Sequence, residues 1–77
     1  MLQVKEVLSK VNKGLSVELT SHLETINTFK KGEEYHIKVC GIDYRTTDKI
    51  SYVKRLAGFI DRYQLAISYL RLFSPYN

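Results

Sequence analysis

The chain has one cysteine and no apolar run long enough to cross a membrane. Cys40 cannot form a disulfide within one copy of the chain, and the sequence shows no set of four closely spaced ligands of the kind that structural zinc requires. A membrane-spanning helix needs about 20 apolar residues. The longest apolar candidate, residues 65–73, contains Ser68 and Arg71. The sequence therefore excludes disulfide-rich scaffolds and helical membrane spans.

Glycine and proline are sparse and scattered. The four glycines match neither of the phosphate-binding spacings G-x-x-x-x-G-K-[ST] and G-x-G-x-x-G. No linker or internal repeat is visible, so residues 1–77 are expected to form a single small domain. Lys5, Glu6 and Lys10 interrupt the first apolar residues, which is unlike a secretory signal. Together with the lone cysteine, this predicts a cytoplasmic protein.

No group of side chains has the spacing of a catalytic or metal site. His36 and Cys40 are four residues apart on a predicted strand, but strand alternation places Asp43 on the opposite face. The adjacent carboxylates Glu33 and Glu34 fall in a predicted turn, where we expect both to be solvated and not to act as a catalytic pair. We therefore predict a protein that is not an enzyme and has no catalytic residues, no cofactor and no metal.

The fold class predicted from the hydrophobic pattern is α+β. Residues 2–12 carry apolar side chains at helical spacing, which predicts a short N-terminal helix. Gly32 lies in a short polar turn, and beyond it the odd-numbered residues from Tyr35 to Val39 are apolar. This pattern predicts an antiparallel β-hairpin formed by residues of about 15–29 and 34–44, with Gly41 at a bulge or bend.

Residues 15–29 fit two patterns. Val17, Leu19 and Leu23 alternate with polar residues, as in a strand, but the apolar residues of this segment also occur at helical spacing. Ser21 and Glu24 have the spacing of a helix capping box. The β-branched residues of the segment favour a strand, so we predict a strand here.

A long C-terminal helix is predicted from about residue 48. Thr47 or Asp48 can cap its first turn. Its apolar face repeats at three- and four-residue steps through Tyr52, Leu56, Phe59, Ile60, Tyr63, Ile67 and Leu70. The pattern degrades after Gln64, which leaves two interpretations: a helix that continues to residue 73, or a separate strand over residues 64–73. The continuous helix is preferred because no Gly, Pro, Asn or Asp interrupts residues 62–73.

The positive charge is concentrated near the C-terminus. All four arginines lie in residues 45–77, which carry six Lys and Arg against two Asp and therefore account for the whole net charge of +4. Four of the six tyrosines lie there as well. Arg and Tyr are enriched where proteins contact partners.

This composition predicts a small regulatory or interaction module that contacts another macromolecule through its C-terminal segment. The expected partner is a protein or a second subunit, and the sequence leaves open whether the chain forms a homo-oligomer. If the helix is continuous, Arg55, Arg62 and Tyr69 share one stripe. An aromatic end formed by Tyr69, Arg71, Phe73 and Tyr76 follows. The candidate partner-binding residues are Arg55, Arg62, Tyr69, Arg71 and Phe73.

Nucleic-acid binding is the alternative interpretation of the same basic surface. The isoelectric point of about 9.3 and the helical arginines favour it, whereas the sequence has none of the known nucleic-acid-binding signatures. The residues that would contact phosphates in this interpretation are Lys30, Lys31, Arg45, Lys54, Arg55 and Arg62.

Overall fold

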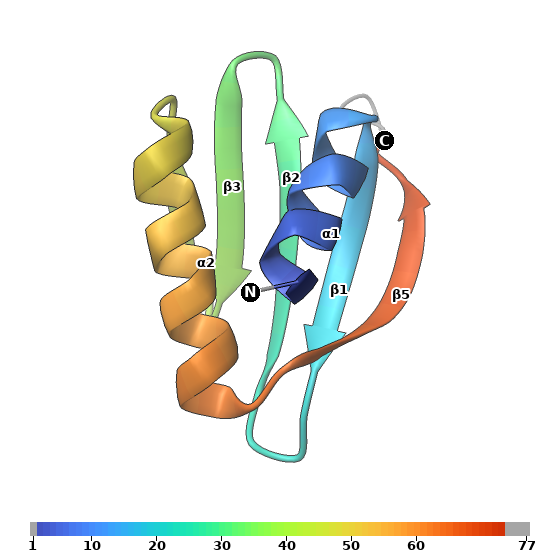
Figure 1. The fold of residues 1–77 in the computed structure, drawn as a ribbon, viewed down its shortest axis with the longest axis vertical. Coiled ribbons are helices and arrows are strands. Elements are labelled where there is room, and N and C mark those ends of the chain that lie inside the picture. Colours follow the sequence, from blue (N-terminus) through green and yellow to red (C-terminus); the bar gives the residue numbers. More distant parts are fainter. Residues whose placement is uncertain (1, 74–77) are drawn as a thin grey trace.

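The computed structural model describes residues 2–73 and contains two helices and five strands (Figure 1). In chain order these are α1 (Leu2–Asn12), β1 (Leu15–Thr20), β2 (Thr25–Lys31), β3 (Glu34–Val39), β4 (Ile42–Thr46), α2 (Lys49–Tyr63) and β5 (Ala66–Leu72). The predicted α+β class and the N-terminal helix are confirmed.

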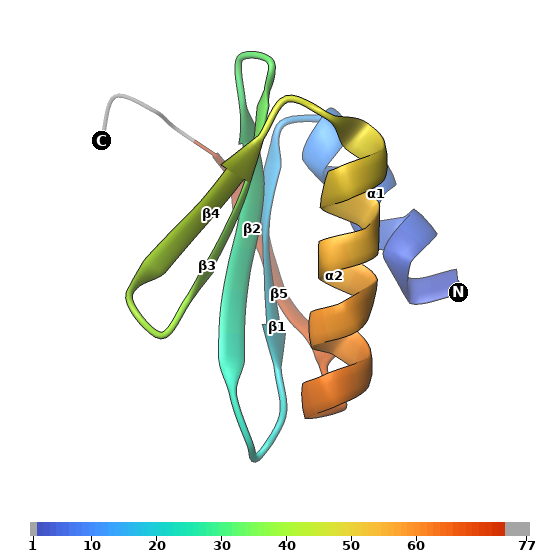
Figure 2. The same cartoon turned by 90° about the vertical axis from the view of Figure 1, so that its left-hand side faces the viewer.

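The five strands form one antiparallel sheet in the order β4-β3-β2-β1-β5. Both helices lie on the same face of this sheet, as the side view in Figure 2 shows. Among residues 2–73 no helix lies on the opposite face, which is called the open face below. The strands β4 and β5 are the two edges.

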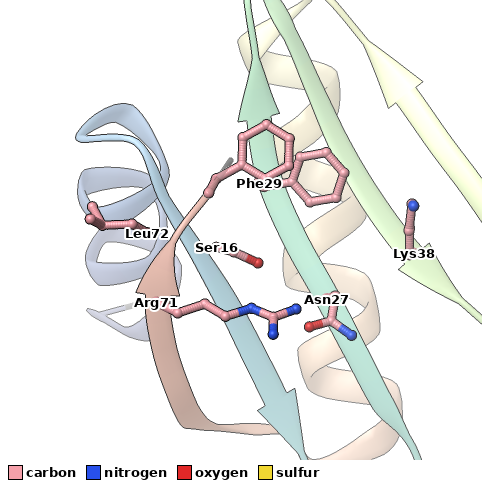
Figure 3. Close-up of a pocket in the computed structure, with 7 residues that line it drawn as sticks. Ser16, Asn27, Phe29, Lys38, Arg71 and Leu72 are labelled. Carbon is pink, nitrogen blue, oxygen red and sulfur yellow. The ribbon is translucent and has the colours of Figure 1, made fainter. Parts of the chain in front are cut away.

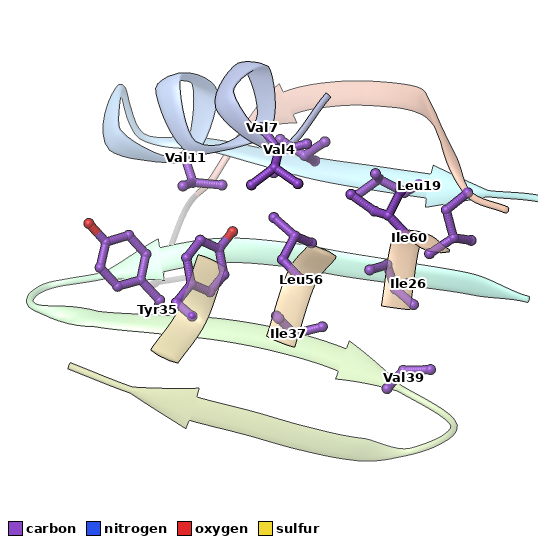
Figure 4. Close-up of a cluster of buried hydrophobic side chains, with 13 residues drawn as sticks. Val4, Val7, Val11, Leu19, Ile26, Tyr35, Ile37, Val39, Leu56 and Ile60 are labelled. Carbon is purple, nitrogen blue, oxygen red and sulfur yellow. The ribbon is translucent and has the colours of Figure 1, made fainter. Parts of the chain in front are cut away.

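The hydrophobic core lies between the helices and the sheet (Figure 4). The odd-numbered residues of β3 point into it, as the alternation predicts, and α2 contributes Tyr52, Leu56 and Ile60. In total, thirteen buried apolar side chains make up this cluster: Val4, Val7, Val11, Val17, Leu19, Ile26, Tyr35, Ile37, Val39, Tyr52, Leu56, Ile60 and Leu65. Neither helix is long and apolar enough to cross a membrane.

Tyr52 is the largest side chain that is fully buried. Its ring stacks on Tyr35 with centroids 4.5 Å apart. Its hydroxyl lies 2.6 Å from Oγ1 of Thr28, which itself donates to the carbonyl of His36 at 2.7 Å. Because the threonine hydroxyl has one proton, Tyr52 must be the donor in the first bond. Burial raises the pKa of Tyr52 to about 12.

This raised pKa predicts a loss of stability at alkaline pH. The unfolded chain loses the Tyr52 proton near pH 10, whereas the folded chain keeps it until about pH 12. The stabilisation that comes from the raised pKa of Tyr52 is therefore complete below pH 10 and disappears as the pH approaches 12. This is a change of about 2–3 kcal/mol in the free energy of unfolding. Urea unfolding of the wild type and Tyr52→Phe from pH 8 to pH 11.5 measures it. The variant should lose less stability over this range. If the free energy of unfolding fell equally with pH in the wild type and in Tyr52→Phe, the expectation would be wrong.

Residues 15–29 form two strands rather than one. A turn at residues 21–24 separates β1 from β2, with Thr20 paired to Thr25. The hydroxyl of Ser21 accepts hydrogen bonds from the backbone N–H groups of Leu23 and Glu24. This is the bonding that made Ser21 resemble a helix cap, since serine satisfies free N–H groups in turns as well. The prediction of extended structure was right, and the predicted hairpin boundaries were wrong.

The segment 34–44 is also interrupted, at Cys40 and Gly41. Val39 pairs with Ile42, so Cys40 and Gly41 form a two-residue hairpin turn between β3 and β4. Both have positive φ angles, 52° and 78°. Such angles are typical of a type I′ turn, whose twist matches the paired strands. Gly41 thus lies in a turn and not at a bulge.

The helix α2 begins where the sequence predicts and ends ten residues before residue 73. Asp48 caps it: Oδ1 accepts from the N–H of Ile50, and Oδ2 accepts from the hydroxyl of Ser51. Both bonds lower the pKa of Asp48, the one from Ser51 most. At the other end, Gln64 takes a left-handed conformation with φ 55°. The chain then reverses direction, Leu65 is buried, and Ala66–Leu72 form β5. The preferred prediction of a continuous helix to residue 73 was therefore wrong.

Gln3 joins the N-terminal helix to this reversal. Its Nε2 donates to the carbonyl of Leu65 at 2.7 Å, and its Oε1 accepts from the N–H of Ile67 at 3.2 Å. One side-chain amide therefore satisfies the backbone on both sides of Ala66. This contact helps to set the position at which β5 enters the sheet beside β1.

Candidate functional site

The open face is formed by alternate residues of all five strands. Cross-strand pairs show which side chains share it, because paired residues point to the same side of a sheet. Ser16 pairs with Arg71, Glu18 with Tyr69, and Asn27 with Lys38. Phe29 pairs with His36, which in turn pairs with Arg45. Aromatic and basic side chains therefore occur together on the face of the sheet opposite α1 and α2.

Three aromatic rings are stacked across this face. The ring of Phe29 lies between those of His36 and Phe73, with centroid distances of 4.8 Å and 4.4 Å and nearly parallel planes. The N–H of Phe73 also donates to the carbonyl of Gly14 at 2.9 Å. These contacts fasten the end of β5 over β1 and onto β2, so Phe73 has a structural role in addition to any contact with a partner.

His36 is buried beside two carboxylates. Its Nδ1 lies 3.0 Å from Oδ1 of Asp43, and its Nε2 lies 3.6 Å from Oε1 of Glu34, too far for a hydrogen bond. The prediction that Asp43 faces away from His36 was wrong, because the turn at residues 40–41 reverses the chain. The pair lacks a neighbouring nucleophile: Sγ of Cys40 donates to Oε2 of Glu24 at 2.9 Å.

The thiol of Cys40 is poorly suited to nucleophilic chemistry. Its hydrogen bond to the Glu24 carboxylate raises the pKa of the thiol, so less thiolate is present at neutral pH. The turn also takes Cys40 off the strand that was expected to align it with His36. Within residues 2–73, no group of three His, Cys, Asp or Glu side chains is arranged to hold a metal ion.

The five candidate partner-binding residues divide into two sets. Tyr69 and Arg71 lie on β5, and Phe73 follows it, whereas Arg55 and Arg62 lie on α2. The predicted stripe of Arg55, Arg62 and Tyr69 does not exist, because Tyr69 is not helical. Tyr76, the fourth member of the predicted aromatic end, lies outside the described residues.

The two helical arginines flank a small groove of about 220 Å³ with Gly58 and Phe59 between them. The guanidinium of Arg55 lies over the ring of Tyr44, 4.8 Å from its centroid. This cation–π contact connects α2 to β4 and gives Arg55 a structural function.

The six residues proposed to contact nucleic acid do not share one surface. Lys30 points toward the helical side, where its Nζ lies 5.2 Å from the centroid of Tyr35. Arg45 lies on the open face through its pairing with His36. Lys31 pairs with Glu34 at the end of the β2–β3 hairpin. The remaining three, Lys54, Arg55 and Arg62, are on α2.

The edge strand β5 carries three of the four large exposed apolar side chains on the described strands, and the fourth is Ile42 on β4. Leu72 is 79% exposed, Tyr69 57% and Leu70 39%. Within β5 only Ile67 is half-buried. The other edge, β4, has five residues, of which Asp43 and Arg45 are charged. Leu70 and Leu72 were not among the candidates: the helical interpretation assigned Leu70 to the apolar face and did not single out Leu72 for partner contact.

A polar groove of about 400 Å³ lies on the open face beside β5 (Figure 3). Its floor is Ser16 on β1, and its walls come from β2, β3 and the end of β5. The lining residues are Ser16, Asn27, Phe29, Lys38, Arg71, Leu72 and Phe73. Of these only Arg71 and Phe73 were sequence candidates.

Comparison of the chain with protein-family models, with curated proteins and with solved structures gives no match. The open face, the β5 edge and the groove are therefore the features that bear on function.

Proposed function

We propose that the protein is a small non-enzymatic interaction module that binds another protein along the free edge of β5. The partner adds an extended segment to the sheet as a sixth strand, and it contacts the exposed side chains of Tyr69, Leu70, Arg71 and Leu72. The observation that carries this proposal is that β5 is an edge strand on which six of the seven residues are exposed.

The physical basis is the unpaired backbone of an edge strand. One side of β5 pairs with β1, and the N–H and C=O groups of its other side can pair with an added strand. Proteins usually protect such edges with charges, proline or short length. The seven-residue strand β5 has one charged residue, Arg71, and no proline. Three exposed apolar side chains beside an open edge are most simply explained by a partner that covers them.

The side chains of this edge also suit protein contact. Tyr and Arg are the residue types most often found at energetically dominant positions of interfaces. Within residues 2–73, no Lys or Arg lies within 4.0 Å of a carboxylate, so Arg71 is available to an acidic group of the partner. Arg55 and Arg62 lie on α2 in the helical layer, and the proposal does not need them.

A charge placed on the edge should weaken the interaction. Leu72→Lys adds a charge to a side chain that is 79% exposed, so the fold should be retained while strand addition becomes unfavourable. Ile50→Lys is the matched control, because Ile50 is 65% exposed and lies in the first turn of α2. Sedimentation measures the affinity of the chain for a second copy of itself. Fluorescence polarisation measures its affinity for peptides selected from a random displayed library. In Leu72→Lys we expect the affinity for the second copy or for the peptide to fall about tenfold or more, which corresponds to 1.4 kcal/mol.

Two results would contradict the proposal. One is an equal loss of affinity in Leu72→Lys and Ile50→Lys, which would indicate a general charge effect. The other is a monomeric protein whose selected peptides bind Leu72→Lys as tightly as the wild type. Duplex DNA binding that weakens with salt and in Arg55→Ala/Arg62→Ala would instead favour the nucleic-acid alternative, with a slope reduced by about two phosphate contacts.

A further inference from the structure

We propose that the groove on the open face binds the phosphate group of a small organic phosphate monoester. The groove is separate from the outer edge of β5 and shares only Arg71 and Leu72 with the proposed protein-binding strand. The inference therefore does not rest on the proposed function. It follows from the charge, the hydrogen-bond donors and the shape of the groove.

The charge of the groove favours a doubly charged anion. Arg71 and Lys38 are two cations among the lining residues, and no carboxylate lines the groove. The nearest acid along β1 is Glu18, whose Oε2 lies 3.2 Å from the hydroxyl of Ser68, within hydrogen-bond distance. A phosphate monoester carries a charge near −2 at neutral pH. Arg71 and Lys38 supply two positive charges to meet it, and Asp43, which pairs with Lys38, lies on the side of Lys38 that faces away from Arg71.

The groove also offers donors without partners. Figure 3 shows Arg71 extending from β5 across β1 toward Asn27, with the hydroxyl of Ser16 above the guanidinium in this view. The side chains of these three residues make no hydrogen bond to any other described residue. A guanidinium binds phosphate oxygens in pairs, and a hydroxyl and an amide supply further donors. The three donors come from three neighbouring strands, which hold them on one rigid surface.

The remaining wall is apolar and can accept the organic part of the ligand. Phe29 and Phe73 form it, and Nζ of Lys38 lies 5.5 Å from the centroid of the Phe29 ring. A volume of about 400 Å³ lies within the range of small-molecule sites. A ligand of nucleotide size would place its phosphate beside Arg71 and its uncharged part beside the rings.

The test is a titration of the ¹⁵N-labelled full chain with AMP, inorganic phosphate and adenosine, followed by NMR. We expect saturable shifts centred on Ser16, Asn27 and Arg71 with AMP, weaker binding of inorganic phosphate, and adenosine weaker than AMP by about tenfold or more, because adenosine has no phosphate for the two cations. Adenosine binding as tightly as AMP would overturn the proposal, as would shifts spread evenly over all basic residues.

Two substitutions sharpen the test. Arg71→Gln removes the guanidinium, and Asn27→Asp places a carboxylate in the groove with almost no change of shape. Each should lower the affinity for AMP about tenfold or more through loss of charge-assisted bonds or repulsion. Arg45→Gln is the control, because Arg45 shares the open face but does not line the groove. An equal loss in Arg45→Gln, or unchanged affinity in Asn27→Asp, would show that the groove is not the site. The spectra also report whether each variant remains folded.

Discussion

Replacement of Tyr52 by alanine should lower the free energy of unfolding by about 3–5 kcal/mol, as for other large aromatic residues removed from a core. Tyr52 is 1% exposed and lies between α2 and the sheet, where it stacks on Tyr35 and donates to Thr28. The truncation would leave a cavity at the centre of a small core and would remove the hydrogen bond that Tyr52 donates to Thr28. Urea unfolding at pH 7 measures the change.

The matched variant Tyr52→Phe separates the ring from the hydroxyl. It keeps the stacked ring and removes one hydrogen bond, so it should cost about 0.5–1.5 kcal/mol. Thr28 retains its bond to the carbonyl of His36 in this variant. If Tyr52→Phe were as damaging as Tyr52→Ala, the hydroxyl network and not ring packing would be the main source of stability.

A chain ending at Gln64 should lose cooperative folding altogether. It lacks Leu65, which is buried, and Ile67, which packs against the core, and it exposes the edge of β1 that pairs with β5. Burial of one leucine contributes about 1.5–3 kcal/mol, and a domain of this size has about 4–12 kcal/mol in total. Loss of one strand therefore removes a large share of the stability. Circular dichroism during thermal unfolding gives the answer.

The control for this truncation is a chain ending at Phe73. It keeps every contact described for β5, including the stack of Phe73 on Phe29, and should unfold cooperatively. A chain ending at Gln64 that retained a sharp transition would mean that β5 docks on a domain that is stable by itself.

The parts of the fold predicted correctly were those specified by local chemistry. Gly32 supplies the positive φ of its turn, and Asp48 caps α2. The alternation from Tyr35 to Val39 correctly gives the buried side of β3. In each case the residues that determine the structure are close together in the sequence, so a short window contains the whole signal.

Two of the errors arose where an unusual residue takes a conformation that glycine or asparagine normally signals. Cys40 and Gln64 are the two non-glycine residues with positive φ among those described. Neither is a common residue at such positions, so the β3–β4 turn and the end of α2 were both missed. The apolar residues Leu65 and Leu72 did indicate a change after Gln64, but pattern alone could not distinguish a buried helix from a strand.

The candidate site was predicted only in part. Composition directed attention to Tyr69, Arg71 and Phe73, and all three lie on β5 or at its end. The groove could not be predicted, because Ser16, Asn27 and Lys38 are ordinary polar residues on three different strands. They become neighbours only through the strand order, which no local pattern specifies.

The pairing of β5 with β1 has a consequence for how quickly the protein reaches its native state. Ser68 and Glu18, which meet in this pairing, are 50 positions apart in the chain, whereas β1 to β4 are joined by short turns. Contacts between distant positions require closure of a long loop and slow the folding rate. We therefore expect the β1–β4 meander to assemble early and the arrival of β5 to set the overall rate. During synthesis, the outer side of β1 would remain without its partner until β5 has left the ribosome.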